Sequence, residues 1–357
     1  MKKKKQRRFG LGSFISVTVL LISAAVLLIS YVSIFISPSR FWPPLFFGLY
    51  YIPIAFWNLF LMIIAIIRRR RRLLIPLDAL LPSLFFFDMF VKVGNNAPDE
   101  EKEGIRIVTY NVGRYSLSKD GKPKRETTAE IREYLKRCEA DIICLQEVSV
   151  KYKDSITELP NYPYLHSHFF NDTGSSFGNV ILSKFPIRGD GKITFKNSTN
   201  LAIWADLRIG RGTVRLYNCH LESYSISFTS IIKRLFNKDT FSDEFISLHG
   251  HLKESNIKRA EQVDCVVSSI NECKMETIVC GDFNDTPMSY TYHQLQKQHK
   301  DCFVEAGNGF GGTYSRLWPA LRLDYILIPE EYRTIYHKIE RVPYSDHYPV
   351  LTEIILD

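Results

Sequence analysis

The chain has 357 residues, of which 45% are hydrophobic and 24% charged, and its formal net charge is +8. Residues 1–95 contain 13 of the 46 basic residues and 2 of the 38 acidic ones, which leaves 33 basic and 36 acidic residues, a balance of −3, for the rest. The larger part of the chain therefore lacks the net positive charge with which most duplex-binding proteins hold nucleic acid, and only a local basic patch could replace it.

Two long uncharged runs lie near the start of the chain, at residues 9–39 and 41–67. Each is longer than the roughly 20 apolar residues that cross a bilayer as a helix. The basic residues at positions 2–8 are also typical of a cleavable signal peptide. However, the first run exceeds a signal-peptide core of about 7–15 residues, and no clear small-x-small cleavage site ends it. We therefore predict two membrane-spanning helices.

A third apolar segment, residues 73–93, contains two prolines and the carboxylates Asp78 and Asp88. Carboxylates are costly inside a bilayer, so the alternative for this segment is a re-entrant or interfacial helix. Positive charge is retained in the cytoplasm, which places residues 2–8 and 68–72 inside. Three spans then put the rest of the chain outside the cytoplasm, whereas two spans leave it inside. We predict a multi-pass protein of the cell (inner) membrane with three spans and an extracytoplasmic domain.

The polar, acidic stretch at residues 94–104 is typical of a short tether. We therefore divide the chain into a membrane anchor at residues 1–94, with two or three transmembrane helices, and a soluble domain at residues 95–357. All seven cysteines lie in the soluble domain, with neither a short-spaced disulfide framework nor the spacing of a zinc site. We expect buried free thiols.

From residue 105 onward, short apolar runs rich in β-branched residues end in a polar residue able to bind metal or phosphate. Strands of this kind would bring their polar ends to one rim of a sheet core. The apolar spacing in residues 126–138 predicts a helix with one buried face, and residues 178–187 and 201–209 have the shorter period of strands. This mixture indicates a layered α/β or α+β domain. The runs are 105–110 before Asn111, 142–145 before Gln146 and Glu147, 214–219 before His220, and 277–280 before Gly281 and Asp282.

Two later polar tracts, at residues 322–325 and 345–349, add Asp324, Asp346 and His347. Carboxylates with an amide and imidazoles around them suit Mg²⁺ or Mn²⁺. Phosphoester hydrolysis needs such a cation, an oriented water molecule, and donors for the charge that develops in the transition state. The residue set therefore favours a metal-dependent phosphoesterase.

Seven tracts occur in the order and approximate spacing of the endonuclease/exonuclease/phosphatase superfamily, so that the chain resembles this superfamily over nearly all of residues 95–357. Its members include pancreatic-type deoxyribonucleases, apurinic endonucleases, inositol polyphosphate phosphatases and neutral sphingomyelinases. One such tract is weak evidence, whereas seven in register are strong evidence. The resemblance implies a four-layer α/β/β/α sandwich of the α/β class, here preceded by the N-terminal transmembrane helical anchor. The tracts are TYNVG, ICLQEV, GNVILSKFPI, LYNCHLES, VCGDFNDTP, RLDYIL and YSDHYPV.

The resemblance also implies a metal site. Glu147 matches the principal metal ligand of the superfamily, and Asn111 matches a residue beside it that is a ligand or an amide that orients the phosphate. Asp346 matches a ligand on the metal side. The implied cofactor is Mg²⁺ or Mn²⁺.

Catalytic roles are implied by the same resemblance. Asp282 matches the residue that orients or deprotonates the attacking water, and Asn284 matches the residue that positions this water. His347 would contact the scissile phosphate and transfer protons, polarised by Asp324. His220 resembles the second phosphate-contacting histidine of the deoxyribonuclease and sphingomyelinase branches rather than the asparagine of apurinic endonucleases.

Some of these residues also have a purely structural interpretation. Asp282 and Asn284 are residues that favour turns and helix caps. Arg259 with Gln262 matches a family pair before the GDFND strand, which would make Arg259 a substrate-binding residue, but an exposed helix face explains the pair equally well. Residues 223–258 form a long connection that is a substrate lid, a second membrane contact or a plain helical insertion.

Three classes of function remain: a hydrolase of lipid or small phosphoesters, a membrane-tethered endo- or exonuclease, and a catalytically silent scaffold. The complete set of acidic and imidazole residues disfavours the scaffold. The anchor and the balance of −3 favour the hydrolase over the nuclease. We therefore predict a metal-dependent hydrolase of a lipid or small phosphoester at the membrane. Its partners would be this substrate and the bilayer, with nucleic acid less favoured and no obligate protein partner implied.

Overall fold

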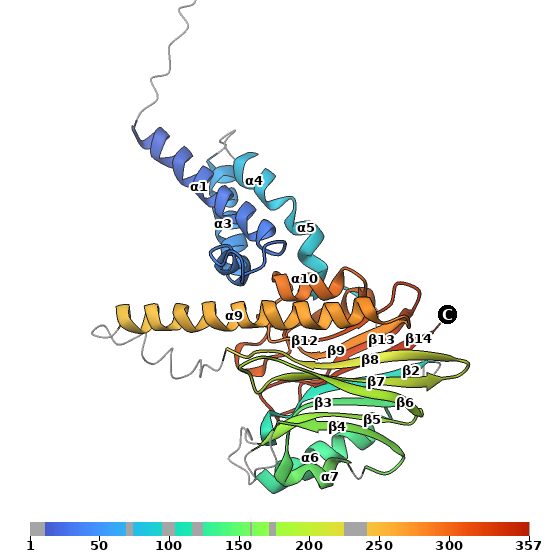
Figure 1. The fold of residues 1–357 in the computed structure, drawn as a ribbon. Helices are drawn as coiled ribbons and strands as arrows, with labels where there is room; N and C mark the ends of the chain where they lie inside the picture. The colour runs from blue at the N-terminus through green and yellow to red at the C-terminus, as the bar shows by residue number, and fades with distance from the viewer. Residues whose placement is uncertain are drawn as a thin grey trace, which may run out of the picture.

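The computed structural model describes residues 11–68, 74–94, 104–115, 124–157, 159–170, 176–224 and 241–356. They form a group of N-terminal helices that lies against one side of a two-sheet domain (Figure 1). The basic residues 2–8 and 69–72, most of the expected tether and residues 225–240 of the long connection lie outside the described residues.

The N-terminal helices are apolar but differ in length. Among the described residues, only α1 is long and apolar enough to cross a membrane, and this judgement rests on its length and composition alone. The second apolar run is interrupted at Tyr50, so that α3 is a shorter helix of 17 residues. The helices are α1 (Leu11–Ser33), α2 (Leu45–Leu49), α3 (Tyr51–Ile67), α4 (Leu74–Leu80) and α5 (Ser83–Phe86).

The third apolar segment is not a continuous helix, which corrects the expectation of a third span. Pro82 caps the start of α5, where proline cannot continue the preceding helix, and a 3₁₀ turn at Phe87–Met89 follows. The segment then ends in the short strand β1 (Val91–Lys92), which pairs with β11 (Gly309–Phe310) of the domain. Multi-pass insertion with three spans is therefore not supported, and α1 is the one candidate in the described part of the chain.

Two six-stranded sheets form the centre of the domain. The first has the order β10-β12-β9-β8-β7-β6 and the second β13-β14-β2-β3-β5-β4. The strands of the first sheet are β6 (Ile187–Thr194), β7 (Leu201–Ile209), β8 (Gly212–His220), β9 (Thr277–Asp282), β10 (Lys300–Asp301) and β12 (Asp324–Ile328). Those of the second are β2 (Ile105–Asn111), β3 (Ile142–Ser149), β4 (Tyr164–Phe169), β5 (Phe177–Ser183), β13 (Arg333–Ile339) and β14 (Val350–Ile355).

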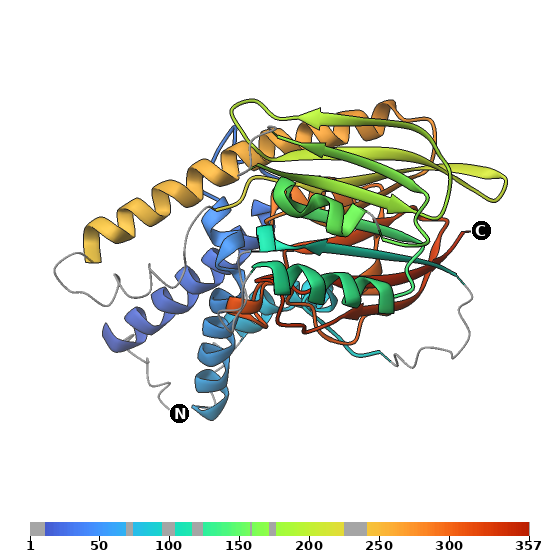
Figure 2. The ribbon, with the colours of Figure 1, turned by 90° about the horizontal axis from the view of Figure 1, so that it is seen from below.

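The sheets pack face to face, and helices cover their outer faces. Ile107 and Ile181 of the second sheet share one buried cluster with Ile203 and Ile278 of the first. The outer face of the second sheet is covered by α6 (Lys124–Arg137) and α7 (Lys153–Thr157), and that of the first by α9 (Phe241–Glu272) and α10 (Tyr290–Gln296). Figure 1 shows the layers edge-on, and Figure 2 shows the green helices α6 and α7 from below. The predicted α/β/β/α sandwich is confirmed.

Parallel pairing brings the polar strand ends to one rim. The parallel pair β2 and β3 places Asn111 opposite Gln146, and the parallel pair β8 and β9 places His220 opposite Asp282. Strand β12 runs antiparallel to β9, so its first residue, Asp324, lies opposite Asp282 as well. The expectation that these polar residues share one rim is confirmed.

The helical region and the domain share hydrogen bonds and a core. Beyond the β1–β11 pairing, the Gly311 N–H donates to the Phe90 carbonyl at 2.9 Å, and Arg322 Nη1 donates to the Met89 carbonyl at 3.0 Å. Gly48 of α2 lies so close to Met288 that an added Cβ would be 2.3 Å from the Met288 carbonyl oxygen. The division at residues 94 and 95 stays a prediction, and these contacts cross it.

Of the long connection that was expected at residues 223–258, residues 241–258 belong to α9, a helix of 32 residues. Its second half packs on the first sheet through Val263, Val266 and Ile270. This part of the connection is therefore helical. All seven cysteines are free, as expected, and five of them are buried.

Candidate active site

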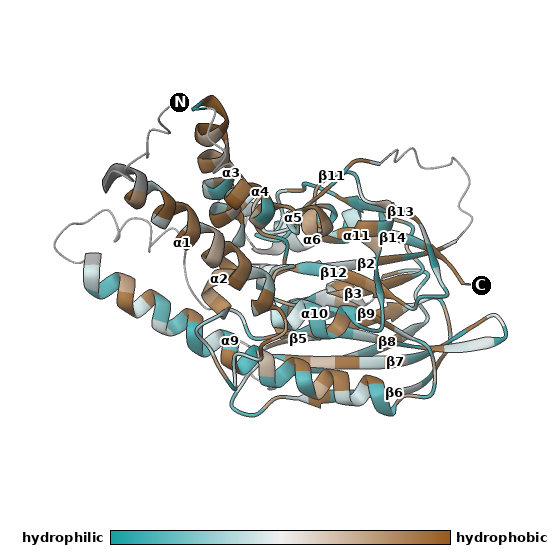
Figure 3. Ribbon diagram, turned by 90° about the horizontal axis from the view of Figure 1, so that it is seen from above, coloured by the Kyte–Doolittle hydropathy of each residue, from teal (hydrophilic) through white to brown (hydrophobic). Residues whose placement is uncertain are grey.

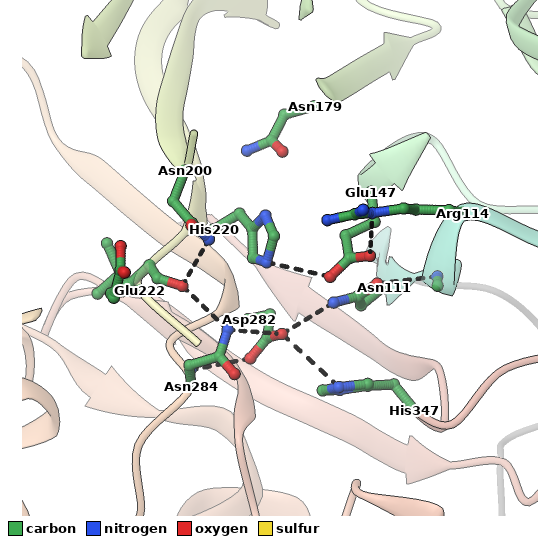
Figure 4. Close-up of polar contacts among 12 residues, drawn as sticks. Asn111, Arg114, Glu147, Asn179, Asn200, His220, Glu222, Asp282, Asn284 and His347 are labelled. Atoms are coloured by element: carbon green, nitrogen blue, oxygen red, sulfur yellow. Dashed lines mark hydrogen bonds and ion pairs between the residues drawn. The ribbon is translucent and has the colours of Figure 1, made fainter. Parts of the chain in front are cut away.

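Asp282 lies at the centre of the rim, at the end of β9, and is fully buried. Its Oδ1 accepts a hydrogen bond from the backbone N–H of Asn284 at 2.8 Å. Its Oδ2 accepts bonds from Asn111 Nδ2 at 2.9 Å and from Asn284 Nδ2 at 3.1 Å (Figure 4). Gly281 allows this close approach of β9 to β8, since its φ is +128° and a Cβ there would lie 2.0 Å from the Cys219 carbonyl oxygen. Burial raises the pKa of Asp282 to about 6.

A histidine–aspartate pair lies beside this carboxylate. His347 Nδ1 lies 2.8 Å from Asp324 Oδ2, and His347 Nε2 lies 3.7 Å from Asp282 Oδ2. Burial alone lowers the pKa of His347, but the Asp324 and Asp282 carboxylates outweigh it, so this pKa lies well above its usual value. The imidazole therefore tends to carry two protons, one of them directed at Asp324.

On the opposite side of Asp282, Glu147 and His220 face one another. Glu147 Oε1 lies 3.5 Å from His220 Nε2, and Glu147 Oε2 accepts a hydrogen bond from Arg114 Nε at 3.2 Å. Burial raises the pKa of Glu147 and lowers that of His220 to about 4. Arg114 also lies 3.7 Å above the ring of Phe177. The site thus combines one buried and one half-buried carboxylate with one neutral and one protonated imidazole.

Backbone strain is concentrated at the same place. Arg114, Glu147 and Asn284 are non-glycine residues with φ of 53–54°. Such conformations cost about 1–3 kcal/mol each and persist only where the surrounding structure imposes them. At Glu147 the strain coincides with a register shift between β3 and β5, and this bulge turns the carboxylate toward the rim.

The predicted metal-side residue Asp346 lies at the edge of the site. Its Oδ2 is 3.9 Å from Arg316 Nε, and its charge contributes to the raised pKa of Glu147. The preceding Ser345 hydroxyl donates to the Asn111 carbonyl at 2.8 Å, which ties this loop to the end of β2. Asn111 Oδ1 accepts a hydrogen bond from Gly113 N at 2.9 Å.

A second group of possible metal-binding side chains lies at the same rim. Single ligand atoms of Asp282, Asp324 and His347 lie within 4.8 Å of one another. Asp324 and His347 are already bonded to each other, so this group is explained as a carboxylate–histidine pair beside Asp282. The paired groups do not need a cation, whereas burial penalises the charged forms of half-buried Glu147 and buried Asp282.

Arg259 does not lie on an exposed helix face, and its role in substrate binding stays a prediction. Its side chain is fully buried, which excludes an exposed helix face. Nη1 forms an ion pair with Asp285 Oδ2 at 3.2 Å, Nε donates to the Glu222 carbonyl at 2.8 Å, and the guanidinium stacks on Tyr224. These internal partners make Arg259 a support for the loop after Asp282, while its Nη2 has no hydrogen-bond partner among the described residues. Gln262 is its neighbour and accepts a hydrogen bond from the Glu222 N–H at 2.7 Å.

A buried amide network between the sheets was not predicted. Gln146 Nε2 donates to Asn218 Oδ1 at 2.7 Å, and Asn218 Nδ2 donates to the Leu145 and Val180 carbonyls at 3.0 Å. Asn179 Nδ2 donates to the Asn218 carbonyl at 3.1 Å. The sequence signal for this network was an amide side chain inside an apolar strand, because a buried amide needs a hydrogen-bond partner. Arg114 was missed because it follows the tract TYNVG without any distinguishing pattern.

The chain is similar to one family of known proteins and to individual relatives. Residues 108–347 match the family described as "Endonuclease/Exonuclease/phosphatase family", and residues 13–90 match a domain of unknown function. The inositol phosphosphingolipids phospholipase C of Schizosaccharomyces pombe is 26% identical over 196 residues, which cover 53% of this chain and 43% of the relative. The uncharacterized protein YbhP of Escherichia coli is 24% identical over 287 residues, 72% of this chain and 100% of the relative. The chain thus spans less than half of the yeast relative and all of the bacterial one.

Solved structures share the fold. A mannosyl-6-phosphatase of Bacteroides thetaiotaomicron has a TM-score of 0.52 and 16% identity, covering 71% of this chain and 100% of the other. The human Nocturnin catalytic domain has a TM-score of 0.53 and 17% identity, covering 72% of this chain and 97% of the other. At such identities the likeness concerns the architecture alone.

Proposed function

Since the chain belongs to the endonuclease/exonuclease/phosphatase family, it is a hydrolase of phosphoester bonds, and we propose that it uses a divalent metal to cleave a lipid or other small phosphoester at a membrane. The observation that carries the metal proposal is the pair of carboxylates at the rim, half-buried Glu147 and buried Asp282, whose charged forms are both penalised by burial. Asn111, bonded to Asp282, lies between them.

The donor set fits a hard cation. Glu147, Asn111 and Asp346 provide carboxylate and amide oxygens, which are the ligands that Mg²⁺ and Mn²⁺ prefer. We assign the cation to these three residues, with Glu147 as the principal ligand. When bound, it would offset the charge of the substrate phosphate. Arg114 holds the Glu147 carboxylate from the other side through its 3.2 Å contact and limits its rotation.

The remaining polar residues supply proton transfer and orientation. Asp282 has a pKa near 6, so it can accept a proton from the attacking water close to neutral pH. Asn284 fixes both oxygens of this carboxylate and would position the water. His347, protonated and held by Asp324, would donate a hydrogen bond to the scissile phosphate and a proton to the leaving oxygen. His220 would contact the phosphate from the Glu147 side.

Membrane association is supported by α1 and by the apolar surface of the helical region. Phe56 of α3 and Phe85 of α5 are 67% and 85% exposed, which is unfavourable in water but not in lipid. Figure 3 shows the brown, apolar helices beside the mixed surface of the domain. A single crossing by α1, with residues 2–8 in the cytoplasm, would place the domain outside the cytoplasm, as three crossings would, but it would also place residues 68–72 outside, whereas their positive charge favours the inside. A reporter fused after Lys92 that requires export for activity tests this side of the membrane.

A lipid substrate is also consistent with the phospholipase C activity for which the yeast relative is named. The negative balance of residues 96–357 gives no general attraction to a polyanion, which disfavours the nuclease alternative. The test is hydrolysis of phospholipids, sphingolipids, inositol phosphates and plasmid DNA by one preparation with Mg²⁺ or Mn²⁺. Asp282→Ala serves as the contamination control. Cleavage of plasmid alone, absent in the control, would establish the nuclease alternative.

A further inference from the structure

An apolar groove lies outside the catalytic site, where the helical region meets the domain. It has a volume of about 620 Å³ and is lined by α3 from Tyr51 to Met62, by α4 and α5, and by Phe310, Pro319 and Ala320 of the domain. Its lining contains no charged residue, and only Tyr51 and Ser83 carry a hydroxyl group. The Ser83 hydroxyl is bonded to the Tyr31 hydroxyl at 2.6 Å. We call this feature the α3–α5 groove.

The dimensions of the groove fit one hydrocarbon chain. From Tyr51 to Met62 the wall follows α3 for eleven residue steps, or about 17 Å at 1.5 Å per residue. Half of a bilayer's hydrocarbon core is about 15 Å thick. The volume lies within the range of about 300–1,000 Å³ that is common for small-molecule sites. The groove is therefore as long as a lipid chain of one leaflet.

The rim of the groove is open to an apolar environment. Phe56, Leu81 and Leu84 line the groove and are also more than half exposed. These residues belong to the helical region that includes α1, the candidate membrane helix. A lipid chain could therefore enter from the surface that we propose lies against the bilayer.

One loop connects the groove to the catalytic site. Phe310, Pro319 and Ala320 of this loop form the domain side of the groove. Between them, the Tyr314 ring lies edge-on to the His347 ring at 5.3 Å. The backbone N–H of Ser315 donates to the Asp346 carbonyl at 2.7 Å. The groove and the catalytic histidine are thus on two sides of a single loop.

A ligand that fits the apolar groove on one side of the loop and the catalytic site on the other has a hydrocarbon chain and a phosphoester headgroup. We propose that the α3–α5 groove binds the chain of a long-chain lipid phosphoester and presents its headgroup to the catalytic site. This inference rests on the proposed function, which it narrows from phosphoesters in general to those that carry a long chain. The alternative occupant is a second protein chain, which would need no catalytic site nearby. The oligomeric state of Ala55→Trp distinguishes it from a lipid.

The test measures chain-length preference without knowledge of the natural headgroup. The full-length protein is assayed in detergent micelles with Mg²⁺ for hydrolysis of bis(p-nitrophenyl) phosphate, and hexadecyl phosphate and butyl phosphate are compared as inhibitors. We expect hexadecyl phosphate to inhibit at a concentration at least tenfold lower than butyl phosphate. In Ala55→Trp, where the indole fills the groove, this ratio should fall at least fivefold.

Two further variants control for partitioning and folding. Leu28→Trp adds the same side chain at an exposed position of α1 outside the groove and should keep the wild-type ratio. Leu84→Glu places a charge at the rim, where the side chain is 71% exposed and not part of the core, and should lower the ratio as Ala55→Trp does. An equal ratio in all four proteins would overturn the inference, and so would a dimer that Ala55→Trp dissociates while the ratio stays unchanged.

A photoreactive analogue separates this inference from the proposed function. Hexadecyl phosphate with a diazirine on its chain should label α3, α4 or α5 in the wild type, and the labelling should fall at least fivefold in Ala55→Trp. Labelling does not need turnover, so it tests the groove even if the soluble ester is not cleaved. No cleavage with specific labelling would refute the proposed function alone. Cleavage with labelling that is equal in Ala55→Trp would refute the groove alone.

Discussion

His347 Nδ1 lies 2.8 Å from Asp324 Oδ2, inside the protein, while the other ring nitrogen lies 3.7 Å from Asp282 Oδ2. The Asp324 carboxylate therefore fixes the orientation of the ring and favours its protonated form. Because β12 starts opposite the end of β9, Asp324 and the proposed general base Asp282 come from adjacent strands.

The first prediction concerns this pair. Asp324→Asn keeps the size of the side chain but removes the charge that supports the His347 imidazolium. We expect kcat to fall by about 10²–10⁴-fold, the usual contribution of a positioned acid or base. Asp190→Asn is the matched control, because Asp190 pairs with His166 at 3.1 Å on the surface and away from the site. Equal activities of the two variants would contradict the role of Asp324.

The second prediction concerns the metal. Glu147→Gln removes the charge of the proposed principal ligand, so the Mg²⁺ concentration for half-maximal activity should rise. The increase should exceed the roughly 10–100-fold effect of losing an outer-shell partner. Titration calorimetry with Mg²⁺ and Mn²⁺ measures the same loss without turnover. Glu133→Gln, at an exposed position of α6, should bind metal as the wild type does. Unchanged metal binding by Glu147→Gln would assign the cation to other ligands.

The third prediction compares neighbouring cations on α9. Arg259 is fully buried against Asp285, so Arg259→Met leaves a buried carboxylate without its partner and should lower the free energy of unfolding by about 3–5 kcal/mol. Lys258 is partly exposed, and its Nζ lies 3.5 Å from Glu222 Oε1. Lys258→Met should therefore cost less than about 1 kcal/mol. Urea denaturation of both variants measures the difference, and equal losses would show that burial of Arg259 contributes no extra stability.

The fourth prediction concerns stability in acid. Burial lowers the pKa of His337 to about 3, whereas an unfolded histidine titrates near 6.5. Between these values the unfolded state binds a proton that the folded state does not. The stability from the neutral ring is thus present above pH 6.5 and is lost as the pH falls toward 3, by about 1.4 kcal/mol for each pH unit.

Denaturation of His337→Gln between pH 7 and 4 isolates this contribution. Its free energy of unfolding should depend less steeply on pH than that of the wild type. His251→Gln, at an exposed position of α9, is the control and should follow the wild type. A wild-type slope in His337→Gln would show that the ring does not resist protonation.

The strand ends that form the site could be predicted from the sequence for a physical reason. An apolar run that ends in a polar residue records both the buried strand and the point where it reaches the rim, as at Asn111, His220 and Asp282. The partners of these residues depend on how two sheets and a distant helix meet. The Arg259–Asp285 pair joins α9 to the loop after β9, and no local pattern at either residue indicates the other.

In the helical region, by contrast, the sequence did not predict where the helices end. Counting apolar residues predicted long spans, because composition does not reveal where a helix stops. The breaks at Tyr50 and Pro82 shorten α3 and separate α4 from α5. The pairing of Val91 with Phe310 then draws the end of the third segment into the domain, 219 positions away in the chain. Only the fold of the whole chain places these two segments together.

The most direct test of metal-dependent phosphoester hydrolysis is the rate at which the purified full-length protein cleaves bis(p-nitrophenyl) phosphate, measured after EDTA treatment and again after Mg²⁺ or Mn²⁺ is restored. The wild type should lose its activity in EDTA and regain it with the metal. Asp282→Ala, confirmed as folded by circular dichroism, should stay at least about 10²-fold less active in every condition. Full activity of the wild type in EDTA, or of folded Asp282→Ala with metal, would contradict the mechanism.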